Sequence, residues 1–446
     1  MAFWEGGFAE SGVARTLIIL SALAVLAGCG STQDAKTAPA VEKLRWSLVL
    51  KAPPIMNTLA VGKDGMIYVG ATDKRVYAID KAGREKWEKD LDNLVMGPIA
   101  TGPSGDIYIT TYGAQEVPPR ASQAVVPGFE HLYVFDKNGR TRADVAVNGA
   151  GPIAVGKDGA VYFRGWSSLG NDGVLYAYDP DGHQKWSFKV DGILGVVQTG
   201  KDGGVYMAVG PGSMNAKVIA LTAEGQERWK FLLGPEENAG SLVGGEDIVY
   251  IVCGNRYGYG RFLRALSSGG KFLWEHESSG RIISVAADKG DTAVMVGAED
   301  AGDPAARGSE VLTARAYDSG GFLKWTREFT EDQGHRTGSL NVGQDGTVYF
   351  TEDVLAGSTW GLFALTRKGD LKWKVQARAP LANDGLLHLG SIGPDDQEAT
   401  FVSLDSNGDK RWDYTVSAPV NNTPVIGLDG TLFIGGNAKL YALLAW

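Results

Sequence analysis

The chain has 446 residues, a formal net charge of −9 and 44% hydrophobic residues, a content that excludes wholesale disorder. Acidic and basic residues are interspersed without a basic stripe or tail, so no nucleic-acid partner is expected, because phosphate binding needs clustered Lys and Arg. The 62 glycines and the 10% aromatic content favour many short strands joined by tight turns.

The N-terminal residues have the pattern of a bacterial lipoprotein signal. Residues 17–28 form an apolar or small run, interrupted by Ser21, that is shorter than the roughly 20 residues of a spanning helix. The run ends in Leu-Ala-Gly before Cys29, which resembles a lipobox and implies cleavage before Cys29 and lipidation of its thiol. The alternative is an ordinary secretory signal with a chance cysteine. We expect residues 1–28 to be a signal peptide and residues 29–42 to be the lipid anchor with a flexible tether.

From residue 43 to residue 446 the sequence repeats one unit of roughly 40–50 residues. Each unit predicts strands A, B, C and D in an antiparallel meander. An Asp-Gly-type turn joins A to B, and an Asp-x-x-Gly turn such as residues 80–83 joins C to D. We expect two-residue A–B turns with both residues at positive φ. The A–B turns are expected, nine in all, at 64–65, 104–105, 158–159, 202–203, 246–247, 290–291, 345–346, 384–385 and 429–430.

A four-stranded sheet of this size cannot bury both of its faces alone, so the units must stack face to face. We therefore predict a single all-β domain, a β-propeller of nine repeat units, over residues 43–446. The last unit lacks a D strand. Residues 44–48, at the start of the repeat region, have the pattern of a D strand but are not preceded by strands A, B and C. We expect this N-terminal strand to complete the last blade and close the ring.

One tryptophan recurs in the D strand of nearly every unit. Because these residues stand in register, we interpret them as wedges between neighbouring blades rather than as substrate-stacking side chains. In one degenerate unit Ala143 occupies the position. The structural tryptophans are Trp46, Trp87, Trp186, Trp229, Trp274, Trp325, Trp373 and Trp412.

The connections between strands differ in length on the two faces of the predicted ring. A–B and C–D turns are uniformly short, whereas the insertions cluster in the B–C connections, and such loops usually carry binding sites. Arginine and aromatic side chains in these loops and one D–A connection suit an interface, although each one alone could equally be a packed loop residue. The candidates are Arg120, Trp166, Arg256, Tyr257, Tyr259, Arg261, His335, Arg336 and Trp360.

The sequence offers no pattern for catalysis, a metal or a cofactor. Its five histidines have no ligand-like spacing, and there is no Gly-x-Ser-x-Gly motif. Cys253 lies in an apolar run and is expected to be a buried, inert thiol. Residues 405–409 superficially suggest a calcium loop but occupy the position of a repeat turn.

The recurring Tyr-Ala-x-Asp-x-x-Gly-x-x-x-Trp pattern, with the lipobox, resembles the PQQ-like repeat propellers and among them the BamB family of outer-membrane assembly lipoproteins. The resemblance implies a ring that usually has eight blades and a non-catalytic scaffold that presents one face to a protein partner in the cell envelope. Gly30, where an Asp would indicate inner-membrane retention, favours the outer membrane. We expect a monomeric propeller without a cofactor.

Two other functions remain open. A surface propeller that binds glycans or peptides could use the same aromatic loops. A PQQ-dependent dehydrogenase is disfavoured, because in that family the chemistry calls for a calcium site and commonly adjacent cysteines, whereas this chain has only Cys29 and Cys253.

Overall fold

The structure is a computed structural model. It describes residues 43–55, 57–95, 97–112, 130–147, 149, 152–166, 173–192, 194–210, 216–234, 237–244, 247–255, 260–288, 290, 292–300, 310–329, 335–343, 345–354, 360–376, 378–383, 387–392, 398–405, 407–416 and 425–444. The predicted signal peptide, Cys29 and the tether lie outside these ranges. Every regular element within them is a β-strand. Over the same ranges, no helix has the length and apolar character needed to cross a membrane.

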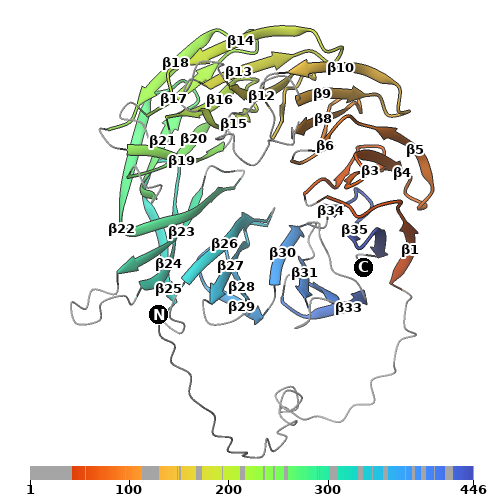
Figure 1. Cartoon of the computed structure of the whole chain (residues 1–446). Coiled ribbons are helices and arrows are strands. Elements are labelled where there is room, and N and C mark those ends of the chain that lie inside the picture. The colour runs from red at the N-terminus through yellow and green to blue at the C-terminus, as the bar shows by residue number, and fades with distance from the viewer. Residues whose placement is uncertain are drawn as a thin grey trace, which may run out of the picture. The chain divides into compact units, whose positions relative to one another are not determined.

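The strands form antiparallel sheets that follow one another around the unit Lys43–Trp446 (Figure 1). The first sheet contains β2 (Ala60–Val61), β3 (Ile67–Ala71), β4 (Arg75–Ile79) and β5 (Glu85–Asp90). The second contains β6 (Leu94–Val95), β7 (Ala100–Thr101), β8 (Ile107–Tyr112), β9 (Glu130–Phe135) and β10 (Thr141–Val147). The third contains β11 (Ala154–Val155), β12 (Val161–Trp166), β13 (Gly173–Tyr178) and β14 (Gln184–Val190).

The fourth sheet comprises β15 (Leu194–Thr199), β16 (Val205–Val209), β17 (Lys217–Leu221) and β18 (Glu227–Leu232). The fifth sheet has seven strands: β19 (Glu237–Gly244), β20 (Ile248–Asn255), β21 (Gly260–Ser267), β22 (Phe272–Ala287), β23 (Ala293–Asp300), β24 (Glu310–Tyr317) and β25 (Leu323–Phe329). It covers two sequence units, because the 16-residue β22 serves as the D strand of one and the A strand of the next.

Two more sheets comprise β26 (His335–Val342), β27 (Val348–Val354), β28 (Trp360–Leu365) and β29 (Leu371–Gln376), and β30 (Arg378–Asn383), β31 (Leu387–Ile392), β32 (Ala399–Leu404) and β33 (Lys410–Val416). The last has the order β1-β36-β35-β34, formed by β1 (Leu44–Val49), β36 (Lys439–Leu444), β35 (Thr431–Gly436) and β34 (Val425–Ile426). Here the two ends of the described chain pair, with Trp46 opposite Ala442.

Hydrophobic clusters fill the junctions between neighbouring sheets, and one of them joins the two ends of the sheet order. In that cluster Val69 and Tyr77 of the first sheet pack with Phe433 and Leu440 of the last. A further cluster packs the two halves of the seven-stranded sheet against each other. The core of the domain is thus a succession of interfaces between sheets rather than one central mass.

The tryptophans of the D strands form these junctions in a repeated way. Opposite each ring, the partner residue in strand C is small: Ala78 faces Trp87, and the same pairing recurs in the other units with Ala or, once, Ser. Each of these rings except Trp412 lies against the C–D glycine of the following unit, as Trp46 lies against Gly83. The Trp46 indole N–H also donates to the carbonyl oxygen of Lys81, at 2.9 Å. Burying one such ring contributes about 3 kcal/mol.

The A–B turns differ from the expectation of two-residue hairpins. In the first unit Gly62 N–H donates to Met66 O at 2.8 Å and Gly65 N–H to Gly62 O at 2.9 Å, which makes a three-residue loop with a bulge. Only Gly65 has positive φ, at 80°, because the Asp64 carboxylate accepts the Met66 N–H and holds the preceding residues in an ordinary turn. The prediction of positive φ at both turn residues was wrong for this turn.

The C–D turns match their prediction. Asp80 Oδ1 accepts hydrogen bonds from the backbone N–H of Ala82 and Arg84, and Gly83 has φ of 80°. The suspected calcium loop is the same turn, since Asp405 accepts from Asn407 and Asp409 and Gly408 has φ of 83°.

Candidate binding surfaces

The meander places the A–B and C–D turns on one face of the ring and the B–C and D–A connections on the other. We call these the turn face and the insertion face. The described strands border the insertions as predicted: β8 ends at Tyr112, and β9 begins at Glu130. The insertion face therefore carries the long connections.

The predicted binding residues lie at or between these strand ends. Arg261 is the one among them whose side chain is described, and it is paired on the strand surface with Glu277, at 2.6 Å from Nη2 to Oε1. The backbones of four others end or begin strands: Trp166 in β12, His335 and Arg336 in β26, and Trp360 in β28. Arg120, Arg256, Tyr257 and Tyr259 lie outside the described residues.

A cluster that the sequence did not predict lies on the insertion side of the first two sheets. His131 Nδ1 is 2.7 Å from Asp144 Oδ1, and its Nε2 is 3.8 Å from Asp92 Oδ2. Tyr133 stacks on the imidazole and donates its hydroxyl to Asp92 at 3.1 Å. A nitrogen and two carboxylates could serve as cation ligands, but here the three groups are engaged with one another.

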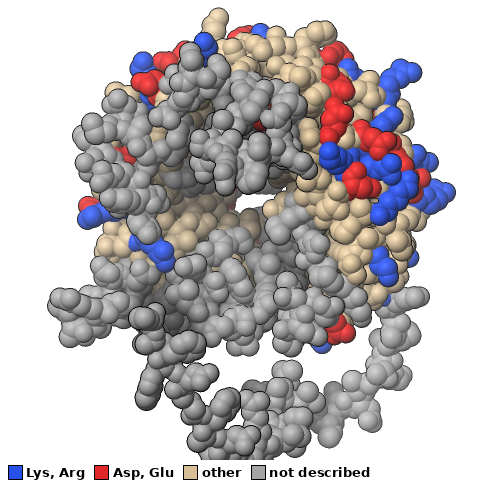
Figure 2. Space-filling model, viewed as in Figure 1, with Lys and Arg blue, Asp and Glu red and all other residues tan. Residues whose placement is uncertain are grey.

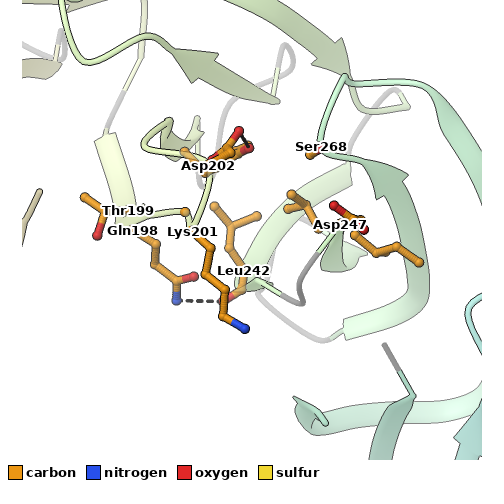
Figure 3. A pocket seen from close by; sticks show the side chains of 11 residues that line it. Gln198, Thr199, Lys201, Asp202, Leu242, Asp247 and Ser268 are labelled. Atoms are coloured by element: carbon orange, nitrogen blue, oxygen red, sulfur yellow. Dashed lines mark hydrogen bonds between the residues drawn. The ribbon is translucent and has the colours of Figure 1, made fainter. Parts of the chain in front are cut away.

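A shallow pocket opens on the turn face between the fourth and fifth sheets (Figure 3). The labelled side chains around it are polar apart from Leu242: Gln198, Thr199, Lys201, Asp202, Asp247 and Ser268. Gln198 Nε2 donates to the backbone oxygen of Leu242 at 2.8 Å, which fixes one wall. The pocket suits a small polar group rather than an extended ligand.

The carboxylate of Asp202 already has hydrogen-bond partners within the protein at this pocket. Partial burial alone would raise the pKa of its carboxyl group. The hydrogen bonds from Arg228, the Gly204 N–H and the Tyr206 hydroxyl outweigh burial and lower that pKa. Burial, followed by the hydrogen bond to Asp202, raises the pKa of Tyr206 to about 12. Both shifts move away from neutral pH, so neither group is tuned as a general acid or base.

Cys253 is fully buried in β20, as the sequence predicted. Burial raises the pKa of its thiol to about 12, which leaves it without thiolate character at neutral pH.

The charged surface of the first sheet pairs opposite signs. Lys51 Nζ lies 2.5 Å from Glu88 Oε1, and Arg75 Nε lies 2.6 Å from Asp90 Oδ1. Figure 2 shows the same interleaving of blue and red side chains on the right of the view. These groups form exposed ion pairs and do not accumulate one sign of charge.

The repeated four-stranded units, their tryptophan junctions and their sheet order define the protein as a β-propeller. The model of the family described as outer membrane protein assembly factor BamB, a PQQ-like repeat family, matches residues 128–353 and 214–444. Together these matches span well over half of the sequence, and the chain belongs to this family.

Solved structures share the fold at low identity. A eukaryotic initiation factor is 10% identical, with a TM-score of 0.55, over 85% of this chain and 89% of that one. The dihydro-heme d1 dehydrogenase NirN in complex with DHE is 12% identical, with a TM-score of 0.50, over 84% and 79%. BamB from Moraxella catarrhalis is 14% identical, with a TM-score of 0.48, over 89% and 96%. A comparison with curated proteins gives no match.

Proposed function

We propose that the protein is a non-catalytic scaffold of the bacterial cell envelope that supports outer-membrane protein assembly by presenting its insertion face to a protein partner. The observation that carries this proposal is the family match over residues 128–353 and 214–444. The insertions of the B–C connections support it, because they add variable surface to one face of a rigid ring. In this proposal the candidates at residues 120, 166, 256, 257, 259, 261, 335, 336 and 360 contact the partner.

The proposed location is the outer membrane. Residues 1–28 would be removed, Cys29 would carry the lipid, and residues 29–42 would connect it to the monomeric propeller. Globomycin, which blocks lipoprotein signal peptidase, tests this step. The expected result is accumulation of a precursor that keeps residues 1–28, and a Cys29→Ala variant should lack the lipid. Unchanged mass and membrane retention in that variant would contradict the proposed anchor.

We further propose that the ring has nine blades and is closed by β1. Two of the blades would share β22, and the pairing of β1 with β36 supports the closure. Deleting residues 43–50 should then destabilise the whole ring in one transition, because it exposes the edge of β36 and removes Trp46. Deletion of residues 1–42 is the matched control. Equal melting transitions in the two truncated chains would contradict the closure.

Affinity capture of the lipidated protein from envelope extracts tests the scaffold function. The expected co-purifying species is an outer-membrane barrel assembly complex. A variant with residues 256–259 replaced by Gly and Ser should capture less of it, whereas Lys63→Ser, on the exposed turn face, should capture the same amount. Capture that is unaffected by any replacement in the insertion loops would contradict the role of the insertion face.

A titration with PQQ and calcium tests the absence of catalysis. Saturable binding accompanied by dye reduction would overturn the non-catalytic proposal. Selective retention on immobilised glycans, without capture of an assembly complex, would favour the glycan-binding alternative.

A further inference from the structure

Three consecutive units carry exposed apolar side chains at the start of their D strands. The second residue after the C–D glycine is Phe272, Leu323 or Leu371 in these units, with 44%, 55% and 39% exposure. Leu273 and Phe322 beside them are 39% and 74% exposed. In the five other units with this glycine the same position is polar: Glu85, Thr141, Gln184, Glu227 and Lys410. We call Phe272, Leu273, Phe322, Leu323 and Leu371 the apolar rim.

The members of the apolar rim lie on adjacent outer strands. The Trp274 indole in β22 donates to Ser319 O at 3.0 Å. This hydrogen bond holds the turn that contains Phe322 against β22, the strand that contains Phe272. The Trp325 indole in β25 donates to Arg367 O at 2.9 Å. In the same way, this bond holds the turn that precedes Leu371 against β25. The five side chains therefore form a row along the turn face.

Basic residues flank this row. The segments 267–273, 318–324 and 366–372 contain five basic and two acidic residues, whereas the whole chain has a net charge of −9. The basic residues are Lys271, Lys324, Arg367, Lys368 and Lys372. Arg367 is paired with Asp288, at 3.2 Å from Nη2 to Oδ2, which leaves the four lysines as the basic flank. Of the two acidic ones, Asp318 is engaged in its own turn, where it accepts the N–H of Gly320 and Phe322. Exposed Phe and Leu side chains beside basic residues suit a surface that carries anionic groups on its outside and has an apolar interior.

The chain also enters the propeller on this face. Lys43 O accepts the N–H of Leu444, at 2.8 Å, where strand C of the last sheet ends and its D strand, β1, begins. In every unit the passage from C to D lies on the turn face, so Lys43 lies on the same face as the apolar rim.

We propose that the apolar rim docks the propeller on an anionic lipid surface. Phe272, Phe322 and Leu323 enter the interface between headgroups and acyl chains, and the flanking lysines contact lipid phosphates. The turn face then lies against the membrane and the insertion face points away from it, toward partners. The orientation rests in part on the proposed lipid at Cys29, but the surface contact itself does not.

Vesicle co-sedimentation tests this contact on the chain Lys43–Trp446, which carries no lipid and forms a compact unit of its own. We expect binding to vesicles of phosphatidylglycerol and phosphatidylethanolamine, and weaker binding to phosphatidylcholine alone. The triple variant Phe272→Gln, Leu323→Gln, Leu371→Gln should lower the partition coefficient at least about tenfold. Glutamine is tolerated at this position, since Gln184 occupies it in another unit.

Leu232→Gln is the matched control, because this leucine is 65% exposed at the opposite end of a D strand. It should leave vesicle binding unchanged, and circular dichroism should show the same fold for both variants. Equal binding by the triple variant and the parent would overturn the proposal. A second outcome would also overturn it: the triple variant loses self-association or capture of a protein partner, but binds vesicles as well as the parent does. Loss of vesicle binding with intact capture of the assembly complex would separate this proposal from the proposed function.

Discussion

The A–B turn of the fourth sheet and the C–D turn that follows β21 in the fifth sheet have nearly the same backbone but different surroundings. Gly203, in an A–B turn, and Gly270, in a C–D turn, have φ of 83° and 84°, and each N–H donates to the carbonyl oxygen three residues earlier. A Cβ at Gly203 would meet nothing within 4 Å, whereas one at Gly270 would lie 2.4 Å from Trp229 Cγ. Glycine is needed for the backbone in the first turn, and for both backbone and packing in the second.

This difference shows where the ring is held together. At these two positions, the glycine of the A–B turn has no neighbour in another unit, while the glycine of the C–D turn packs against a tryptophan of the preceding unit. The four predictions below test that division, from the largest expected effect to the smallest.

Removing a junction tryptophan should have the largest effect. Trp229→Ala deletes a ring packed against Gly270, together with the hydrogen bond from its indole to Ser268 O, and should lower the free energy of unfolding by about 3–5 kcal/mol. Leu232→Ala, on the same strand but exposed, should cost less than about 0.5 kcal/mol. Urea unfolding measures both, and similar losses in the two variants would show that the junction ring is not important for stability.

The two glycines should respond differently to alanine. Gly203→Ala should cost about 1 kcal/mol for the positive φ alone. Gly270→Ala should cost about 2–3 kcal/mol, because the added methyl group also displaces Trp229. In the Trp229→Ala background the excess cost at position 270 should disappear. A persistent excess in that double variant would mean that packing against the ring is not its cause.

Restoring the tryptophan in the degenerate unit should destabilise the protein. Gly182 of the following unit already lies against Ala143, and a Cβ there would be 2.5 Å from the Ala143 methyl group. Ala143→Trp should therefore cost about 1–3 kcal/mol by overpacking, although it matches the repeat. A higher thermal midpoint in this variant would show that the junction has room for the ring.

The smallest effect concerns pH. The lowered pKa of Asp202 means that its ionised form stabilises the fold above the unfolded pKa of about 4 and that this contribution is lost as the pH falls further. Asp202→Asn should therefore show a shallower loss of stability than the parent below about pH 4. Glu227→Gln, an exposed carboxylate on β18, is the control. If the free energy of unfolding falls equally steeply below about pH 4 in Asp202→Asn and in the parent, this role of Asp202 is contradicted.

Much of the fold could be predicted because its determinants repeat. The register of Trp and Ala in strands C and D recurs often enough to reveal the unit, and the Asp80 turn follows from local hydrogen bonding. The geometry of the A–B turn was missed because Asp-Gly also fits a longer loop in which only the glycine has positive φ.

The candidate sites were less predictable, because they combine residues of different units. Asp92 lies in the connection between the first two sheets, whereas His131 follows a long insertion, and no local pattern relates them. The apolar rim is visible as a departure at positions 272, 323 and 371 of the repeat. Its meaning, however, depends on solvent exposure, which the sequence does not provide.

The pairing of β1 with β36 also affects how the protein folds during synthesis. Leu44 has Leu443 as its strand partner, so the first strand to emerge waits for the last one before it can form its hydrogen bonds. Contacts between such distant parts of a chain form slowly. Until then, the nascent chain exposes one strand without a partner and one tryptophan without a junction.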